Sequence, residues 1–123
     1  MSLGDKINII KMKLYNYNIE IIRVIDGDTV DVMVDLGFSV WVEKRVRLFD
    51  IDAPETRTKD LEEKEKGKAT KLRLQEMLNK DDATLQSHGV DKYGRCLGTL
   101  YVKQDNLNEL LISEGFATRY NKS

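Results

Sequence analysis

Apolar and polar residues alternate with a period of two in the first half of the chain. Residues 15–25 are rich in isoleucine, and most even-numbered positions of residues 29–35 and 40–49 are apolar. Such alternation is typical of strands that are buried on one face. Turn-forming residues around Gly27 and Gly37 separate the three segments, which predicts an antiparallel three-stranded meander.

The second half of the chain begins with a helical pattern. Residues 61–78 form a charged segment with a period near 3.6, and two shorter strands are predicted at residues 83–87 and 97–103, joined by a loop at 88–94. A second helix is expected to begin at Asn106, because a glutamate three residues later resembles the other half of a capping box. The inward stripe of the long helix is predicted to contain Thr70, Leu74, Met77 and Leu78.

Five strands, with one long helix between the third and the fourth and a short C-terminal helix, predict an α+β fold that is mainly β. The architecture that fits this order is a five-stranded OB-fold barrel, which presents nucleic acid on one face and in the adjoining loops. A length of 123 residues corresponds to one domain. We expect this domain to span residues 1–123, with residues 1–15 at its start either disordered or not part of the natural protein.

The composition restricts the chemistry. One cysteine and one histidine exclude an internal disulfide and argue against a thiolate zinc site. The net charge of −1 argues against a surface that is basic throughout, although a bound cation would reverse the sign around carboxylate ligands. No apolar segment approaches the ~20 residues that span a bilayer, so no membrane association is expected. The first residues lack the apolar stretch of a secretory signal, and a cytoplasmic location is expected unless a signal has been removed.

Two short acidic segments carry the candidate chemistry. The sequence Ile-Asp-Gly-Asp-Thr-Val occupies residues 25–30, and Arg-Leu-Phe-Asp-Ile-Asp-Ala-Pro-Glu-Thr occupies residues 47–56. Carboxylates gathered near strand ends need a positive partner, and a hard cation with oxygen ligands, such as Ca²⁺, is the simplest one. Arg47 beside these acids indicates that an anion binds as well. A metal, carboxylates and an arginine together are the groups that phosphoryl-transfer chemistry uses.

A third segment, Asp-Lys-Tyr-Gly-Arg at residues 91–95, completes a recognisable order of motifs. With the segments at 25–30 and 47–56, the chain resembles the staphylococcal nuclease (thermonuclease) family over roughly residues 19–117. The resemblance implies a calcium-dependent nuclease that hydrolyses phosphodiester bonds of DNA and RNA on a five-stranded OB barrel.

The resemblance also implies a Ca²⁺ site. By position, Asp28 and Asp52 would be side-chain ligands, and the main-chain carbonyl of Ala53 would be a third ligand. Members of the family usually have threonine where this chain has Ala53. A carbonyl ligand does not depend on the side chain, so the change is compatible with the site.

The resemblance further implies which residues act on the phosphodiester. Arg47 and Arg95 would bind the phosphate, and Glu55 would orient or deprotonate the attacking water. Lys92 and Tyr93 would contact the neighbouring terminal phosphate. Two guanidiniums supply bidentate donors for the charge that builds up on the phosphate oxygens.

Binding of the substrate base is assigned by the same resemblance. Family members carry base-flanking tyrosines beyond the position of Ala117, and Tyr120 is the aromatic residue near that point here. They also commonly carry lysines in the loop where this chain has Asp60 and Leu61. The expected partner is therefore nucleic acid, with Tyr120 as the stacking residue, and a protein partner or self-association stays open.

Two other functions fit the same fold. A nuclease-like module without catalysis would bind nucleic acid or protein, but such modules lose the acids or arginines of the site. A simple single-strand binder would need several exposed aromatic residues and a basic groove, and an aromatic content of 7% does not favour it. The enzyme is favoured because the chain keeps Asp28, Arg47, Asp52, Glu55 and Arg95.

Overall fold

The structure is a computed structural model that describes residues 15–120 of the chain. The expectation for residues 1–15 therefore concerns residues that, apart from Tyr15, lie outside the described range.

The first three strands form the antiparallel meander that the alternating pattern predicts. They are β1 (Asn16–Asp26), β2 (Thr29–Asp35) and β3 (Trp41–Leu48), and β2 pairs with both of the others. Alternation places the apolar residues of β2 on the inside of the sheet, where they are buried. These residues are Val30, Val32 and Val34.

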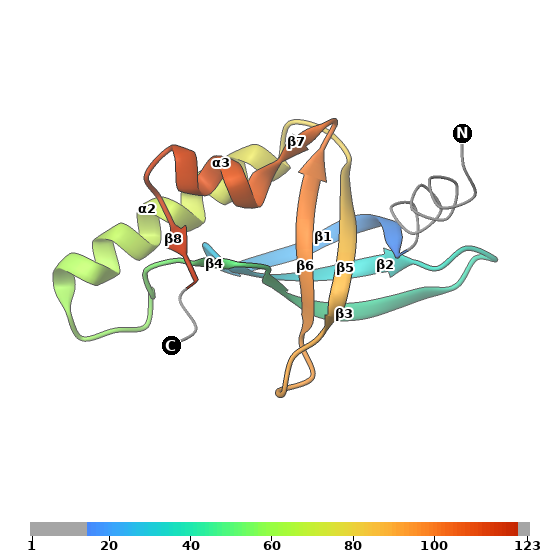
Figure 1. Ribbon diagram of the computed structural model, residues 1–123, viewed down its shortest axis with the longest axis horizontal. Coiled ribbons are helices and arrows are strands. Elements are labelled where there is room, and N and C mark those ends of the chain that lie inside the picture. The colour runs from blue at the N-terminus through green and yellow to red at the C-terminus, as the bar shows by residue number, and fades with distance from the viewer. Residues whose placement is uncertain (1–14, 121–123) are drawn as a thin grey trace, which may run out of the picture.

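Two further long strands close the sheet into a barrel. β5 (Ala83–Val90) pairs with β1, and β6 (Cys96–Val102) pairs with β5 and, in parallel, with β3. Figure 1 shows β5 and β6 crossing the meander at a steep angle. This closed five-stranded arrangement, with a long helix between the third and the fourth long strands, confirms the predicted OB-fold class.

Three two-residue strands complete the β-structure. β4 (Ile51–Asp52) pairs with β8 (Thr118–Arg119), and β7 (Asp105–Asn106) pairs with β6. The β4–β8 pair brings the end of the described chain beside the segment that follows β3, so residues from both ends of the sequence meet there.

The long helix α2 (Leu61–Leu78) has the predicted bounds. The side chain of Asp60 caps it by accepting the main-chain N–H groups of Glu62 and Glu63. The buried residues confirm the predicted stripe and add Gly67 to it. Within residues 15–120, no helix combines the length and the apolar character needed to cross a membrane.

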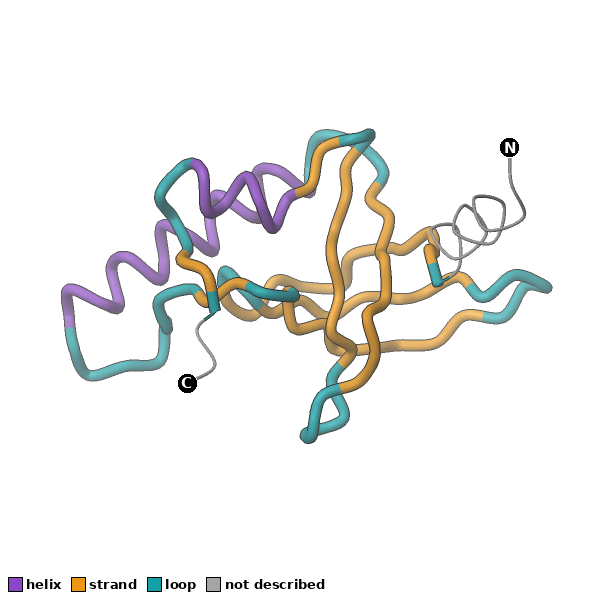
Figure 2. The backbone as a smooth tube through the Cα atoms, in the orientation of Figure 1, coloured by secondary structure: helices purple, strands orange, loops and turns teal. Residues whose placement is uncertain are grey.

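The short helix α3 (Leu107–Ser113) starts as predicted, because the side chain of Asn106 accepts the N–H of Glu109 at 3.0 Å. Helices α2 and α3 lie on the same side of the barrel, as the separation of helix and strand in Figure 2 shows. Thr70 of α2 links the two helical parts of the chain by donating its hydroxyl to the carbonyl oxygen of Phe116 at 2.8 Å.

The prediction of a loop at residues 88–94 is wrong for residues 88–90. β5 continues to Val90, because a bulge between Ser87 and Gly89 keeps the strand paired with β6. A bulge accommodates one extra residue within an antiparallel pair. The turn between β5 and β6 is therefore limited to residues 91–95.

Candidate active site

Arg47 lies at the centre of the candidate site, near the end of β3, and its side chain is only 13% exposed. Its Nη1 atom donates to the carbonyl oxygens of Leu48 at 2.9 Å and Ile51 at 2.8 Å. Its Nη2 atom lies 3.4 Å from Asp28 Oδ2 and 3.3 Å from Asp52 Oδ1. Two carboxylates from separate acidic segments therefore converge on one guanidinium nitrogen.

Asp28 joins the two acidic segments. It lies in the turn between β1 and β2 and is only 8% exposed. Its Oδ2 atom accepts the main-chain N–H of Ala53 at 2.9 Å, and its Oδ1 atom accepts the hydroxyl of Thr29 at 3.0 Å. In a second link, Asp26 Oδ1 accepts the hydroxyl of Thr56 at 2.6 Å. These bonds hold the first acidic segment against the second.

The donor set fits a hard cation. Asp28 and Asp52 direct oxygens to the same guanidinium nitrogen, so a positive charge is favoured between them. The hydrogen bond to Asp28 places Ala53, the predicted carbonyl ligand, beside the first carboxylate. Ca²⁺ prefers carboxylate, carbonyl and water oxygens. Among the described residues, no group of three or more His, Cys, Asp or Glu side chains could hold a metal, so a site here needs main-chain or water oxygens as well.

Glu55 lies in the loop between β4 and α2 and is exposed to solvent. Its main chain is held by close approach of α2: a Cβ atom at Gly67 would lie 2.6 Å from the Glu55 carbonyl oxygen and 2.9 Å from that of Pro54. Real Cβ atoms essentially never come so close, so only glycine fits at this contact. Within the described part of the chain, the Glu55 carboxylate has no hydrogen bond or ion pair, which leaves it open to accept one.

The predicted phosphate-binding residues Lys92, Tyr93 and Arg95 lie in the turn between β5 and β6. Asp91 organises this turn by accepting the N–H groups of Tyr93 at 2.8 Å and Arg95 at 2.9 Å, and Nε of Arg95 at 2.7 Å. Burial raises the pKa of the Asp91 carboxyl, but the hydrogen bonds from Arg95 and Tyr93 outweigh it and leave the pKa below its ordinary value. The Tyr93 ring, which is 72% exposed, has Arg95 Cζ 5.4 Å and Lys92 Nζ 5.2 Å from its centroid.

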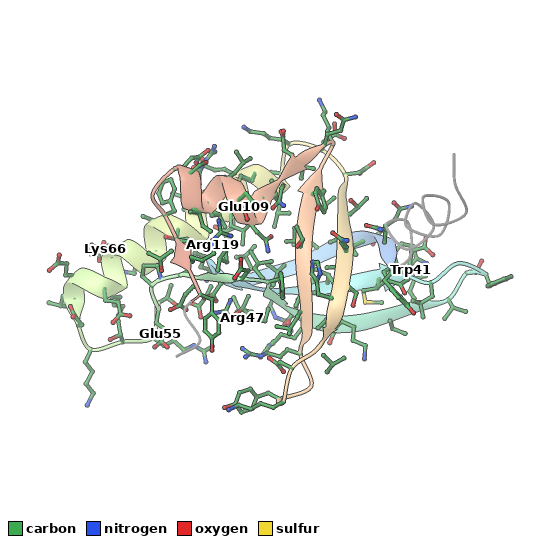
Figure 3. All side chains as sticks on the ribbon, viewed as in Figure 1. Trp41, Arg47, Glu55, Lys66, Glu109 and Arg119 are labelled. Carbon is green, nitrogen blue, oxygen red and sulfur yellow. The ribbon has the colours of Figure 1, made fainter. Side chains whose placement is uncertain are left out.

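Tyr120, the predicted stacking residue, lies over Arg47. The Cζ atom of Arg47 is 5.9 Å from the ring centroid, and the N–H of Tyr120 donates to the carbonyl oxygen of Asp50 at 3.0 Å. The preceding residue, Arg119, binds Asp50 at 3.0 Å and Glu109 at 2.7 and 2.9 Å (Figure 3). The pKa of Arg119 is raised, first by its hydrogen bond to Glu109 and then by that to Asp50. These bonds fix β8, and with it Tyr120, at the edge of the site.

The predicted site residues form two groups, one around Arg47 of β3 and one in the turn that precedes β6. The parallel pairing of these strands sets Arg47 opposite Leu97 and brings the two groups to the same side of the barrel. Between the described residues, no hydrogen bond or ion pair links one group to the other, and Glu55 belongs to neither network. The first group contains Asp28, Arg47, Asp52, Ala53 and Tyr120, and the second contains Lys92, Tyr93 and Arg95.

One cluster of charged residues was not predicted. Arg23 and Arg45 both contact the buried carboxylate of Asp31, two residues along β2 from Thr29. The alternation of β3 places Arg45 and Arg47 on the same face of the sheet. This pattern is the feature of the sequence that indicated a second arginine close to Arg47. The position of Arg23 depends on a bulge in β1, which has no clear mark in the sequence.

Comparison with known proteins finds similarity over most of the chain. A family model described as "Staphylococcal nuclease homologue" matches residues 45–123. The chain is 34% identical over 110 residues to "Protein ParB" of Escherichia coli, a match that covers 82% of this chain and 56% of that protein. It is 33% identical over 110 residues to "Micrococcal nuclease" of Shigella flexneri, covering 82% and 57% respectively.

A third relative comes from a staphylococcus. The chain is 33% identical over 97 residues to "Thermonuclease" of Staphylococcus intermedius, covering 77% of this chain and 55% of that protein. The chain thus spans a little over half the length of the relatives it matches here.

Proposed function

The chain belongs to the staphylococcal nuclease family, and we propose that it is a calcium-dependent nuclease that hydrolyses phosphodiester bonds of DNA and RNA. The observation that carries this proposal is the convergence of Asp28 and Asp52 on Arg47. A cation would bind to the two carboxylates, and a phosphate beside it would bind to the guanidinium of Arg47. Names such as "Micrococcal nuclease" among the relatives support the same reaction class.

In this proposal the carboxylates of Asp28 and Asp52 and the carbonyl of Ala53 would hold Ca²⁺. When bound, the cation supplies a positive charge that stabilises the negative charge developing on the phosphate oxygens. Ca²⁺ accepts oxygen ligands in variable geometries, whereas Mg²⁺ demands near-octahedral coordination and keeps its waters. We therefore expect Mg²⁺ to support cleavage poorly.

Glu55 and the two arginines act on the reacting groups. The exposed Glu55 carboxylate accepts a proton from the attacking water, whose oxygen forms the new bond to phosphorus while the bond to the leaving oxygen breaks. The leaving oxygen takes a proton from solvent. Arg47 and Arg95 donate N–H groups to the phosphate, and an arginine in this role is worth on the order of 10³–10⁵ in rate.

The first experiment measures cleavage of single-stranded DNA and RNA with Ca²⁺ and with a chelator. Glu55→Gln should lower kcat by at least roughly 10², because the amide cannot take the proton. Arg47→Ala should lower kcat by a similar factor or more, and should also lower the melting temperature, since Asp28 loses its ionic partner. Glu20→Gln on the exposed face of β1 is the matched control for Glu55→Gln, and Arg73→Ala on α2 is the control for Arg47→Ala.

The outcomes separate the enzyme from the non-catalytic module. Cleavage that persists in excess chelator would refute the calcium assignment. Near-normal turnover in both Glu55→Gln and Arg47→Ala would show that the active site lies elsewhere. Binding of nucleic acid by the wild-type protein without any cleavage would favour the module.

A further inference from the structure

The charged cluster that sequence reasoning missed lies beside the candidate active site. Asp31 is buried, and its carboxylate is held by arginines from both neighbouring strands. Arg45 contributes Nε at 2.8 Å from Oδ1 and Nη2 at 3.1 Å from Oδ2, and Arg23 contributes Nη2 at 2.8 Å from Oδ2. Hydrogen bonding from Arg45, followed by the charges of both arginines, outweighs burial and keeps the pKa of Asp31 below its ordinary value.

A bulge in β1 creates this cluster. Ile21 pairs with Val32, but Arg23 pairs with Asp31, so Ile22 is an extra residue in β1. In a regular register Ile22 would stand opposite Asp31, and Arg23 would stand opposite Val30 on the buried face of the sheet. Bulges commonly redirect a side chain next to a functional site. Here the bulge turns a cationic residue outward, beside the carboxylate of Asp31.

The two arginines present more donors than one carboxylate can use. Each guanidinium has five N–H donors, and their side chains are 55% and 50% exposed, whereas that of Asp31 is 5% exposed. The groups of this cluster that are exposed to solvent are therefore the N–H donors of the arginines and not the carboxylate of Asp31. Asp31 already fixes the guanidiniums of Arg23 and Arg45. Binding of a ligand would therefore cost less side-chain entropy of these arginines.

An open hollow of about 480 Å³ connects this cluster to the predicted phosphate-binding turn. It is lined by Arg23, Asp31, Glu43, Arg45, Tyr93, Gly94 and Arg95. Arg45 lies two residues from Arg47 on the same face of β3, which corresponds to about 6.8 Å along the strand. The hollow is thus an extension of the candidate active site along the outer face of the barrel.

We propose that this hollow binds a backbone phosphate of a single-stranded nucleic acid next to the one that is cleaved, with Arg23 and Arg45 as its donors. The proposal rests on the proposed function and extends it: the substrate follows the outer face of β3 from Arg47 to Arg45. The exposed ring of Tyr93 at the margin of the hollow provides a surface on which a base stacks. Longer strands therefore bind more tightly than a dinucleotide, which reaches only the cleavage site.

The test compares the wild type with Arg23→Gln, Arg45→Gln and the double variant. The binding of a fluorescent oligothymidylate of eight nucleotides and of the dinucleotide dTpdT is measured at several salt concentrations. Each single variant should weaken binding of the octamer roughly tenfold, the size expected when one charge-assisted hydrogen bond is removed, and leave the dinucleotide unaffected. The slope of log affinity against log salt should become shallower by about 0.7 for each phosphate of the single strand that the variant no longer neutralises.

Two controls make the result specific. Arg73→Gln removes the same charge from an arginine that binds Glu114 on the helical side, and should change neither affinity nor slope. Arg23→Gln keeps the variant foldable, because Arg23 has a single ion pair with Asp31 and the bonds from Arg45 remain. Arg45→Lys should restore part of the affinity, since it keeps the charge without the planar fork.

Unchanged octamer affinity and salt slope in Arg23→Gln and in the double variant would overturn the proposal and leave the cluster a structural ion network. An equal loss for octamer and dinucleotide would overturn it too, because it would place the arginines at the cleavage site. Binding is measured in the presence of Ca²⁺ with a Glu55→Gln background to prevent turnover. Failure of the proposed function would instead appear as the absence of cleavage in the wild-type protein.

Discussion

Asp28 serves both the structure and the chemistry of the site. One of its oxygens fixes the main chain of Ala53, and the same side chain faces Arg47. A buried carboxylate is costly unless it is paired and hydrogen-bonded, and both conditions are met here. The two acidic segments indicated carboxylates with an arginine beside them, and the resemblance to the nuclease family singled out Asp28, Asp52 and Arg47, which the structure brings together. The Arg23 contact to Asp31 was not predictable in the same way, because it depends on one extra residue in β1.

His88 is the only histidine of the chain and gives a specific pH dependence. It lies in β5, its ring stacks on Phe49 with centroids 4.3 Å apart, and its Nε2 atom shares a hydrogen bond with Thr99 Oγ1 at 2.8 Å. Burial lowers the pKa of His88 below its ordinary value. The unfolded chain therefore binds the proton more readily than the folded chain, and protonation favours unfolding.

The sign follows from this lowered pKa. The contribution of His88 to stability is complete above the unfolded pKa of about 6.5 and is lost as the pH falls through the folded pKa. We expect the melting temperature of the wild type to fall as the pH is lowered below about 6.5, and that of His88→Gln to change less. Identical profiles would show that the ring is equally solvated in both states. The acids with lowered pKa values, such as Asp31, act at lower pH and do not interfere.

At the scale of elements, α2 acts as a support for the loop that carries Glu55. Its period and charge pattern were enough to predict its bounds and its buried stripe. The role of Gly67 was not predictable, because glycine within a helix usually only weakens it. The structure shows that the helix approaches the carbonyl groups of Pro54 and Glu55 at this residue. The predicted end of β5 was too early. His88 and Gly89 are residue types that are common in loops, but pairing with β6 keeps them in the strand.

Gly67→Ala tests this support. In an exposed helix, alanine would be favoured over glycine by about 1 kcal/mol. Here the added Cβ would lie 2.6 Å from the Glu55 carbonyl oxygen and 2.7 Å from its carbonyl carbon, so the main chain must shift. We expect a lower free energy of unfolding and a lower kcat, measured by chemical denaturation and by cleavage of single-stranded DNA. Leu72→Ala, at an exposed position of the same helix, should change neither quantity much. A more stable and fully active Gly67→Ala protein would contradict the role assigned to this contact.

At the scale of the whole molecule, ligand binding should be visible as stability. We expect Ca²⁺ together with a nucleoside 3′,5′-bisphosphate to raise the melting temperature more than Ca²⁺ alone, because the arginines and the acids are then both engaged. A ligand that binds only the folded state stabilises it by about 2.7 kcal/mol at one hundred times its Kd. Asp52→Asn should lose most of this increment, and Asp81→Asn, which is remote from the site, should keep it. A melting temperature that the two ligands together do not change would contradict the proposed site.

The parallel pairing of β3 with β6 has a consequence for how the molecule folds. It joins Val46 to Cys96, which are far apart along the chain, whereas the β1–β2–β3 meander uses only neighbouring segments. Contacts between distant segments require the closure of long loops and make folding slow. A chain that has formed only the meander already carries Asp28 and Arg47 but has not yet brought Arg95 beside them. The proposed active site is therefore complete only once the barrel has closed.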